Sequence, residues 1–175
     1  MLLQTSGIPY LIESPIVAKV TRKPYIDKGN YILIGENEVD LSNIGKFRGF
    51  LTHQAINNYR IDKPSVYSVG TFDHLAEDDI IAIYPTGVIR TLYRVKSFHN
   101  FLLFTERCNS NCLMCSQPPK DKDDTDHLYN IYSQLIPLIP KDCFELGITG
   151  GEPTLMGKHY FQLLKLIKSE LPDTE

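Results

Sequence analysis

Three of the four cysteines of the chain lie within the eight-residue stretch CNSNCLMC, at Cys108, Cys112 and Cys115. Thiolates bind soft metals and iron–sulfur clusters, and three of them on a short loop can hold one metal centre from one side. A closed structural site usually has four protein ligands, whereas three thiolates leave one iron of a four-iron cluster open to a ligand that is not protein. The number and spacing of the thiols therefore favour a [4Fe–4S] cluster.

A structural zinc ion is the alternative for the same cysteines. It would need a fourth ligand, for which His127 or Cys143 are the candidates, although zinc sites more often show Cys-x-x-Cys pairs. Cys143 is most simply a small buried hydrophobic residue.

A second motif, GGEPTL, begins at Gly150. Gly150 and Gly151 let the backbone turn sharply and come close to a ligand, because they have no side chains. Glu152 offers a carboxylate to an ammonium group, and Pro153 stiffens the exit from the turn. The plainer alternative is a turn between a strand and a helix, with Glu152 solvated.

The elements that must position the two motifs follow residue 97. A short apolar run predicts a buried strand, and helical spacing of apolar residues predicts helices. The expected elements are a strand at Phe101–Phe104, a helix capped by Asp124 or Thr125 and ending at Pro137, a strand at Phe144–Gly150, and a helix over Tyr160–Ile167 that ends near Pro172. This order predicts parallel strands with crossover helices, and chemistry in such sheets sits at the carboxyl ends of the strands. Both motifs follow a predicted strand at that end.

The first 97 residues show the pattern of short strands separated by turns, with no helical period. The expected strands are Ile16–Val20, Tyr31–Ile34, Phe50–Thr52, Val66–Val69 and Ile80–Ile83. Pro85, Thr86 and Gly87 lie between two β-rich runs and predict a hairpin, because proline presets its φ and glycine tolerates a positive φ.

Together the two motifs resemble those of the radical S-adenosylmethionine (SAM) enzymes. Cys108, Cys112 and Cys115 match the cluster signature of that family, and the run from Gly150 to Pro153 matches its SAM-amine motif in order and position. The resemblance implies a [4Fe–4S] cluster, SAM bound to the open iron, and reductive cleavage of SAM to a 5′-deoxyadenosyl radical that abstracts hydrogen from a substrate. Met114 occupies a position that is often aromatic in the family, so its contact with the adenine would be made through its backbone.

The run from Leu92 to Pro119 and the β-rich segment before it are similar to the radical SAM maturase of the His-Xaa-Ser system. That resemblance implies peptide modification, with a small protein rich in His-Xaa-Ser repeats as substrate and a separate electron donor. A ring contraction like that of 7-carboxy-7-deazaguanine synthase is the alternative within the family, and a non-catalytic zinc module that binds another protein is the alternative outside it.

The expected fold class is α/β, with a small, mostly β domain at residues 1–97 followed at residues 98–175 by the first two βα units of a partial TIM-type barrel. A full barrel takes about 250 residues. We therefore expect a truncated product or a fragment of a longer reading frame, inactive alone.

Composition narrows the partners only slightly. The 175 residues carry a formal net charge of -3, so no basic excess points to nucleic acid. No run approaches the roughly 20 apolar residues of a membrane span, and the N-terminus lacks the pattern of a signal peptide. With few cysteines, clustered rather than spread, the sequence predicts a cytoplasmic protein that acts without a membrane or nucleic acid.

Overall fold

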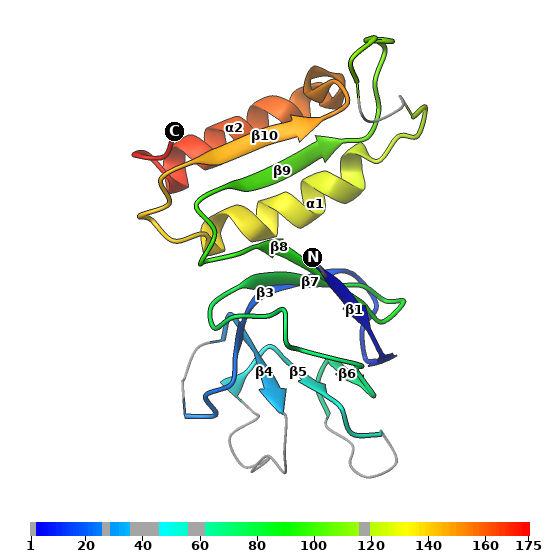
Figure 1. The fold of residues 1–175 in the computed structure, drawn as a ribbon, viewed down its shortest axis with the longest axis vertical. Coiled ribbons are helices and arrows are strands. Elements are labelled where there is room, and N and C mark those ends of the chain that lie inside the picture. Colours follow the sequence, from blue (N-terminus) through cyan, green and yellow to red (C-terminus); the bar gives the residue numbers. More distant parts are fainter. Residues whose placement is uncertain (1–2, 26–28, 36–45, 56–61, 116–119) are drawn as a thin grey trace. The chain divides into compact units, whose positions relative to one another are not determined.

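The computed structural model describes residues 3–25, 29–35, 46–55, 62–115 and 120–175, drawn in colour in Figure 1. The chain divides into two compact units, Met1–Lys96 and Ser97–Glu175, called here the first and the second unit. This division lies one residue before the boundary expected from the sequence.

The first unit is built on one mixed sheet of eight strands, in the order β1-β8-β7-β3-β4-β5-β6-β2. Strands β3 to β6 pair in parallel, and the other pairs in this sheet are antiparallel. The strands are β1 (Gln4–Ser6), β2 (Ile8–Tyr10), β3 (Ile16–Thr21), β4 (Tyr31–Gly35), β5 (Gly49–Thr52), β6 (Ser65–Tyr67), β7 (Ile80–Ile83) and β8 (Val88–Tyr93).

Most of the strands expected in this unit are present with small changes of boundary. The hairpin is confirmed as β7 and β8, and Gly87 has a φ of 81° in its loop. The strand expected at Val66–Val69 ends at Tyr67, because Ser68 takes a positive φ of 52°. Strands β1 and β2 were not predicted, since three-residue strands are too short to show a period.

Gly7 joins the two ends of the sheet. Only this residue separates β1, the first strand in the sheet order, from β2, the last, so the sheet closes on itself there. The Gly7 N–H donates to the Gly87 carbonyl at 3.1 Å, and a Cβ on Gly7 would lie 2.3 Å from the Tyr67 carbonyl oxygen. Closure removes the free edges that an open sheet would expose.

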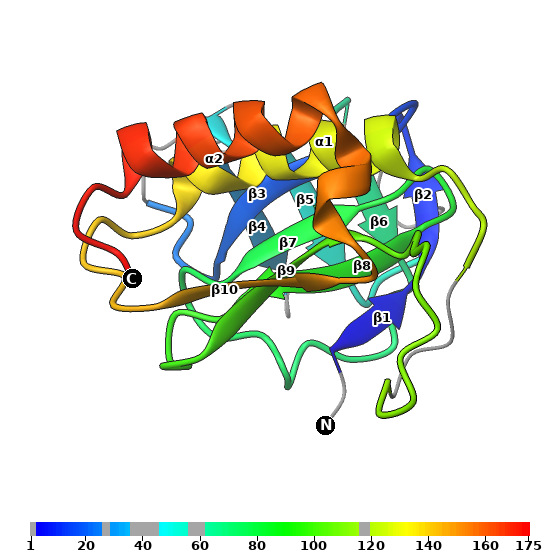
Figure 2. The same ribbon diagram turned by 90° about the horizontal axis from the view of Figure 1, so that it is seen from above.

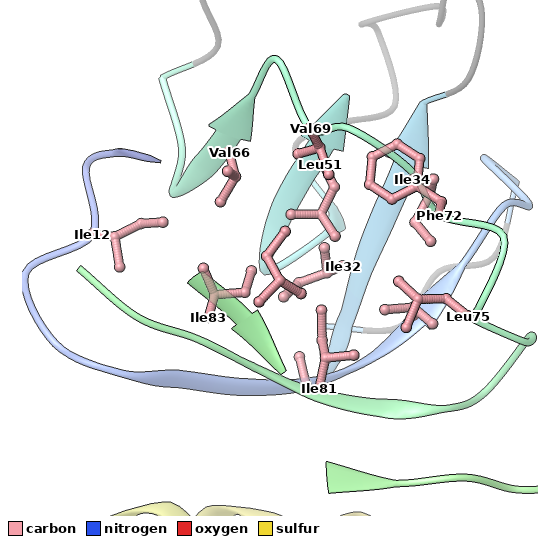
Figure 3. Close-up of a cluster of buried hydrophobic side chains, with 13 residues drawn as sticks. Ile12, Ile32, Ile34, Leu51, Val66, Val69, Phe72, Leu75, Ile81 and Ile83 are labelled. Atoms are coloured by element: carbon pink, nitrogen blue, oxygen red, sulfur yellow. The ribbon is translucent and has the colours of Figure 1, made fainter. Parts of the chain in front are cut away.

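The larger of the two apolar clusters in the first unit lies against one face of this sheet. Along β4, Ile32 and Ile34 join a large apolar cluster (Figure 3), whereas Tyr31 and Leu33 point to the opposite face and a second cluster. The whole of β4 is buried. Burial on both faces explains why this strand is a continuous apolar run rather than an alternating one.

The second unit pairs two parallel strands, β9 (Asn100–Thr105) and β10 (Leu146–Gly150). Its helices are α1 (Thr125–Leu135) and α2 (Lys158–Glu170), with short 3-10 turns η2 (Ile136–Leu138) and η3 (Pro153–Met156). Both helices lie on one face of the pair (Figure 2), and the Phe104 ring contacts Tyr132 of α1 and Tyr160 of α2.

The expected fold class is wrong. The chain is mostly β: eight of the ten strands in its described part belong to one mixed sheet, and it has only two α-helices, of 11 and 13 residues. The second unit does run strand, helix, strand, helix, but two paired strands are not a TIM-type barrel. The barrel was expected from the two motifs of the second unit. The fold class depends instead on the larger sheet of the first unit, and no local sequence pattern predicts that this sheet closes at Gly7.

In the parts of the chain that the structure describes, neither α-helix is long and apolar enough to cross a bilayer.

We predict that Gly7→Ala destabilises the first unit by about 1–3 kcal/mol, the usual range for forcing extra volume into a packed site. The added Cβ would overlap the Tyr67 carbonyl oxygen at the junction of the sheet's two ends. Urea unfolding of the full chain, followed by circular dichroism, measures the change. Gly70→Ala is the control, because nothing lies within 4 Å of a Cβ at that position. Equal midpoints for the two variants would contradict the closure of the sheet at Gly7.

Candidate functional site

The two motifs occupy the carboxyl ends of the parallel strands β9 and β10. The first, called here the cysteine loop (Cys108–Cys115), begins three residues after β9 ends at Thr105. The second, called here the glycine turn (Gly150–Pro153), begins with the last residue of β10. Because the two strands are parallel neighbours, their ends meet at the same edge.

Backbone hydrogen bonds fasten the glycine turn to the segment that leads into the cysteine loop. The Gly151 N–H donates to the Thr105 carbonyl at 2.8 Å, and the Glu152 N–H donates to the Arg107 carbonyl at 2.9 Å. The pairing of β9 with β10 therefore continues up to the residue before Cys108, after a register shift between Thr149 and Gly150.

The two glycines are required by this close approach. Gly150 has a φ of 137°, and a Cβ there would lie 2.3 Å from the Thr105 carbonyl oxygen. A Cβ on Gly151 would lie 2.1 Å from the Arg107 carbonyl oxygen and 2.9 Å from the Cys108 Cβ. The sequence predicts that the glycines let the backbone come close to a ligand. In the structure they admit the backbone at the end of β9, and they bring the glycine turn against Cys108.

Glu152 caps a short helix. Its Oε1 accepts hydrogen bonds from the Thr154 hydroxyl at 2.6 Å and the Thr154 N–H at 3.1 Å, at the start of η3. These bonds, the hydroxyl first, hold the pKa of the Glu152 carboxyl below its usual range. Pro153 is the first residue of η3, where its missing N–H costs nothing. Glu152 is thus a fixed carboxylate rather than a freely solvated one.

The cysteine loop presents its side chains to the outside. Cys112 and Cys115 are exposed and Cys108 is half-buried, and all four cysteines of the chain are thiols. The Cys115 N–H donates to the Cys112 carbonyl at 3.1 Å, which closes a turn around Leu113 and Met114, both almost fully exposed. Among the described residues, no three His, Cys, Asp or Glu side chains lie close enough together to hold a metal ion.

Two residues whose side chains could bind a metal, Cys143 and His99, lie far from the cysteine loop. Cys143 is buried before the first residue of β10, at the opposite end of that strand, with its thiol 3.4 Å from the Glu145 carbonyl. His99 lies before β9 at that same end, where its Nδ1 is 3.3 Å from Glu145. His127 is exposed in the first turn of α1. Neither Cys143 nor His99 can reach the three thiols in this arrangement.

The buried carboxylate of Asp124 supports the site, and no sequence pattern predicts this role. Asp124 is 8% exposed and accepts the Thr105 hydroxyl at 2.5 Å and the Glu106 N–H at 2.9 Å. It was expected to cap α1, but its side chain makes no cap bond, and the Thr125 N–H donates to Asp123 instead. The signal in the sequence was an aspartate at a helix start, which does not distinguish a cap from a tertiary contact.

In comparisons with known proteins, no family model matches the chain, and no curated protein gives a significant sequence match.

Thr154→Val should raise the pKa of Glu152 toward its ordinary value, because the hydroxyl that donates to Oε1 is the first cause of the lowered pKa. A carboxyl whose pKa is lowered by folding stabilises the fold above its unfolded pKa, and this contribution disappears as the pH falls through the folded value. Carbon-13 NMR titration of the glutamate carboxyls measures the shift. Thr149→Val, on the exposed part of β10, is the control. A Glu152 titration that matches that of the control would show that the Thr154 bonds do not hold the carboxylate.

Proposed function

We propose that this chain binds a [4Fe–4S] cluster through Cys108, Cys112 and Cys115 and binds SAM beside it through the glycine turn, as radical SAM enzymes do. The observation that carries the proposal is the contact between the two motifs. Gly151 approaches so closely that a Cβ on it would lie 2.9 Å from the Cys108 Cβ. The two motifs have 34 residues between them, from Cys115 to Gly150, yet they are supported by the same strand end.

The donor set fits an iron–sulfur cluster in its chemistry. Three thiols lie on one exposed loop, and none is consumed by a disulfide. Although the described thiols are not gathered, metal ligands on a loop are commonly drawn together by the metal itself, since a preformed site rarely exists without it. When bound, the cluster and SAM would supply the reductive cleavage of SAM and hydrogen abstraction from a substrate.

The residues around the thiols have separate tasks under this proposal. Cys108, Cys112 and Cys115 hold the cluster, and the exposed turn at Met114 offers its backbone to the adenine of SAM. The Glu152 carboxylate, held by Thr154 through Oε1, offers Oε2 to the ammonium group of SAM. Gly150 and Gly151 bring the backbone of the glycine turn against Cys108, and Pro153 begins η3 directly after Glu152.

The proposed substrate class follows from the resemblance described above. It is a peptide or small protein with His-Xaa-Ser repeats, modified in the cytoplasm with electrons from a separate donor. A ring contraction on a small molecule would use the same residues, so the two are distinguished by supplying each substrate to the reconstituted protein. Cys143, one candidate for the fourth ligand of a zinc module, lies at the far end of β10 and does not favour that alternative.

Replacing any one of Cys108, Cys112 or Cys115 with Ala should abolish cluster assembly, because each supplies one of only three protein bonds to the iron. Anaerobic reconstitution of the full chain, followed by iron and sulfide analysis and absorbance near 400 nm, measures assembly. Cys143→Ala is the matched control and should retain the cluster, since its thiol donates to a carbonyl within its own segment. Loss of iron in that control, as complete as in Cys112→Ala, would indicate a four-cysteine site and refute the proposal.

Glu152→Gln should weaken SAM binding by about 1–3 kcal/mol, the range for losing the charge of one hydrogen-bonded group, while the cluster remains. The amide oxygen can still accept from Thr154, so the start of η3 survives. Titration of SAM against the cluster's absorbance gives the affinity. Glu145→Gln is the matched control, because it removes the same charge just before β10, at the far end of that strand, and should leave SAM binding unchanged. If Glu152→Gln binds SAM as tightly as this control, Glu152 does not belong to the SAM site.

A further inference from the structure

The base of the cysteine loop is closed by one buried polar contact. Thr105, the last residue of β9, is 1% exposed, and Asp124, the residue before α1, is 8% exposed. The Thr105 hydroxyl donates to Asp124 Oδ1 at 2.5 Å. The stretch between these two residues contains all three clustered cysteines. This buried hydrogen bond joins the two points where that stretch leaves and rejoins the packed part of the second unit.

Both partners of this contact make further bonds toward Cys108. Asp124 Oδ2 accepts the Glu106 N–H at 2.9 Å, and the Thr105 hydroxyl oxygen accepts the Arg107 N–H at 3.0 Å. The carboxylate thus orients the two peptide groups that precede Cys108. A carboxylate that is buried and accepts several hydrogen bonds is costly to disturb, because loss of one bond leaves a buried charge unsatisfied.

The segment Thr105–Arg107 also holds the glycine turn. The Thr105 carbonyl accepts the Gly151 N–H, and the Arg107 carbonyl accepts the Glu152 N–H. Side-chain bonds from Asp124 and main-chain bonds to the glycine turn therefore meet on one segment, Thr105–Arg107. Whatever fixes this segment fixes Cys108 and the glycine turn relative to each other.

The other contacts at the loop base are weaker candidates for this task. Lys120 pairs with Glu106, and Arg107 lies 3.8 Å from both Asp121 and Asp123. These side chains are exposed to a third or more of their surface, and exposed ion pairs contribute little. The buried contact is the one whose loss the segment cannot replace with water.

We infer that Asp124, acting through Thr105, is the positioning residue that sets the first cluster thiol and the SAM-binding turn in register. This inference rests on the proposed function for the identity of the two ligands. It assigns Asp124 neither to the cluster nor to SAM. Its task is to hold Thr105–Arg107 so that the two sites face each other at a fixed distance.

The first test needs no cofactor. Thr105→Val removes the hydroxyl at nearly constant volume, and Thr105→Ser restores it. Amide hydrogen exchange of the full apo chain, followed by NMR, should show protection at Glu106, Arg107, Gly151 and Glu152 lowered at least tenfold in Thr105→Val and in Asp124→Asn. The buried residues of α1 report overall unfolding, and Thr105→Ser should keep the original pattern. Loosening confined to Glu106 and Arg107 would overturn the coupling of the two motifs.

The second test uses the reconstituted chain. Thr105→Val should take up iron and sulfide as the unaltered chain does, yet bind SAM at least tenfold more weakly and lose the change that SAM causes in the electron paramagnetic resonance spectrum of the reduced cluster. Asp121→Asn removes a charge from the stretch between Thr105 and Asp124, and it should change neither the SAM affinity nor the spectral response to SAM. An unaltered SAM response in Thr105→Val would overturn the positioning role. If the unaltered chain takes up no cluster, the proposed function fails, and the exchange measurement still decides whether Asp124 couples the two motifs.

Discussion

The arrangement of the candidate site depends on the hydrogen bonding of three residues at the end of β9. The carbonyls of Thr105 and Arg107 accept N–H groups of the glycine turn. The Thr105 hydroxyl and the Glu106 N–H donate to Asp124, and the Arg107 N–H donates to the Thr105 hydroxyl oxygen. Thr105 is buried, so its hydroxyl would be left unsatisfied if Asp124 were removed. The strand end is therefore constrained from two directions, and the chain enters the cysteine loop from a fixed point.

The rest of the second unit explains why this strand end can serve as a support. Leu102 and Phe104 point from β9 into the apolar layer that α1 and α2 form with the sheet, and Tyr132 adds a hydrogen bond from its hydroxyl to the Leu103 carbonyl. Asp124 is fixed in turn because α1 begins directly after it. Packing thus positions the polar contact, and the polar contact positions the thiol. Cys112 and Cys115 remain exposed, as the proposed ligands of an incoming metal need to be.

Local sequence patterns predicted the elements near the site and failed at longer range. The apolar run before the cysteines and the helical spacing after them marked β9 and α1, because burial on one or both faces leaves a period in the sequence. Phe144, at the start of the second expected strand, and Phe161, in the second expected helix, are exposed, since the pattern cannot tell which apolar residue lies at the margin of a layer. The fold class was wrong because pairing between β1, β2 and the rest of the first sheet joins residues far apart in the chain. The roles of Asp124 and of the two glycines depend on tertiary contacts, and no spacing rule contains them.

The two units differ in the side chains that could do chemistry. The first is a closed β structure with an apolar core, and polar side chains within it, such as Asp79 with its bonds to the Ala76 and Val95 N–H groups, satisfy its own backbone. The chemistry proposed here resides in the second unit. The most direct measurement of that claim is the Mössbauer spectrum of the full chain reconstituted anaerobically with iron-57 and sulfide, recorded with and without SAM. We predict the spectrum of a [4Fe–4S] cluster in which one iron of the four changes its isomer shift when SAM is added. A cluster whose four irons are all indifferent to SAM, or a protein that retains zinc and assembles no cluster, would contradict the account.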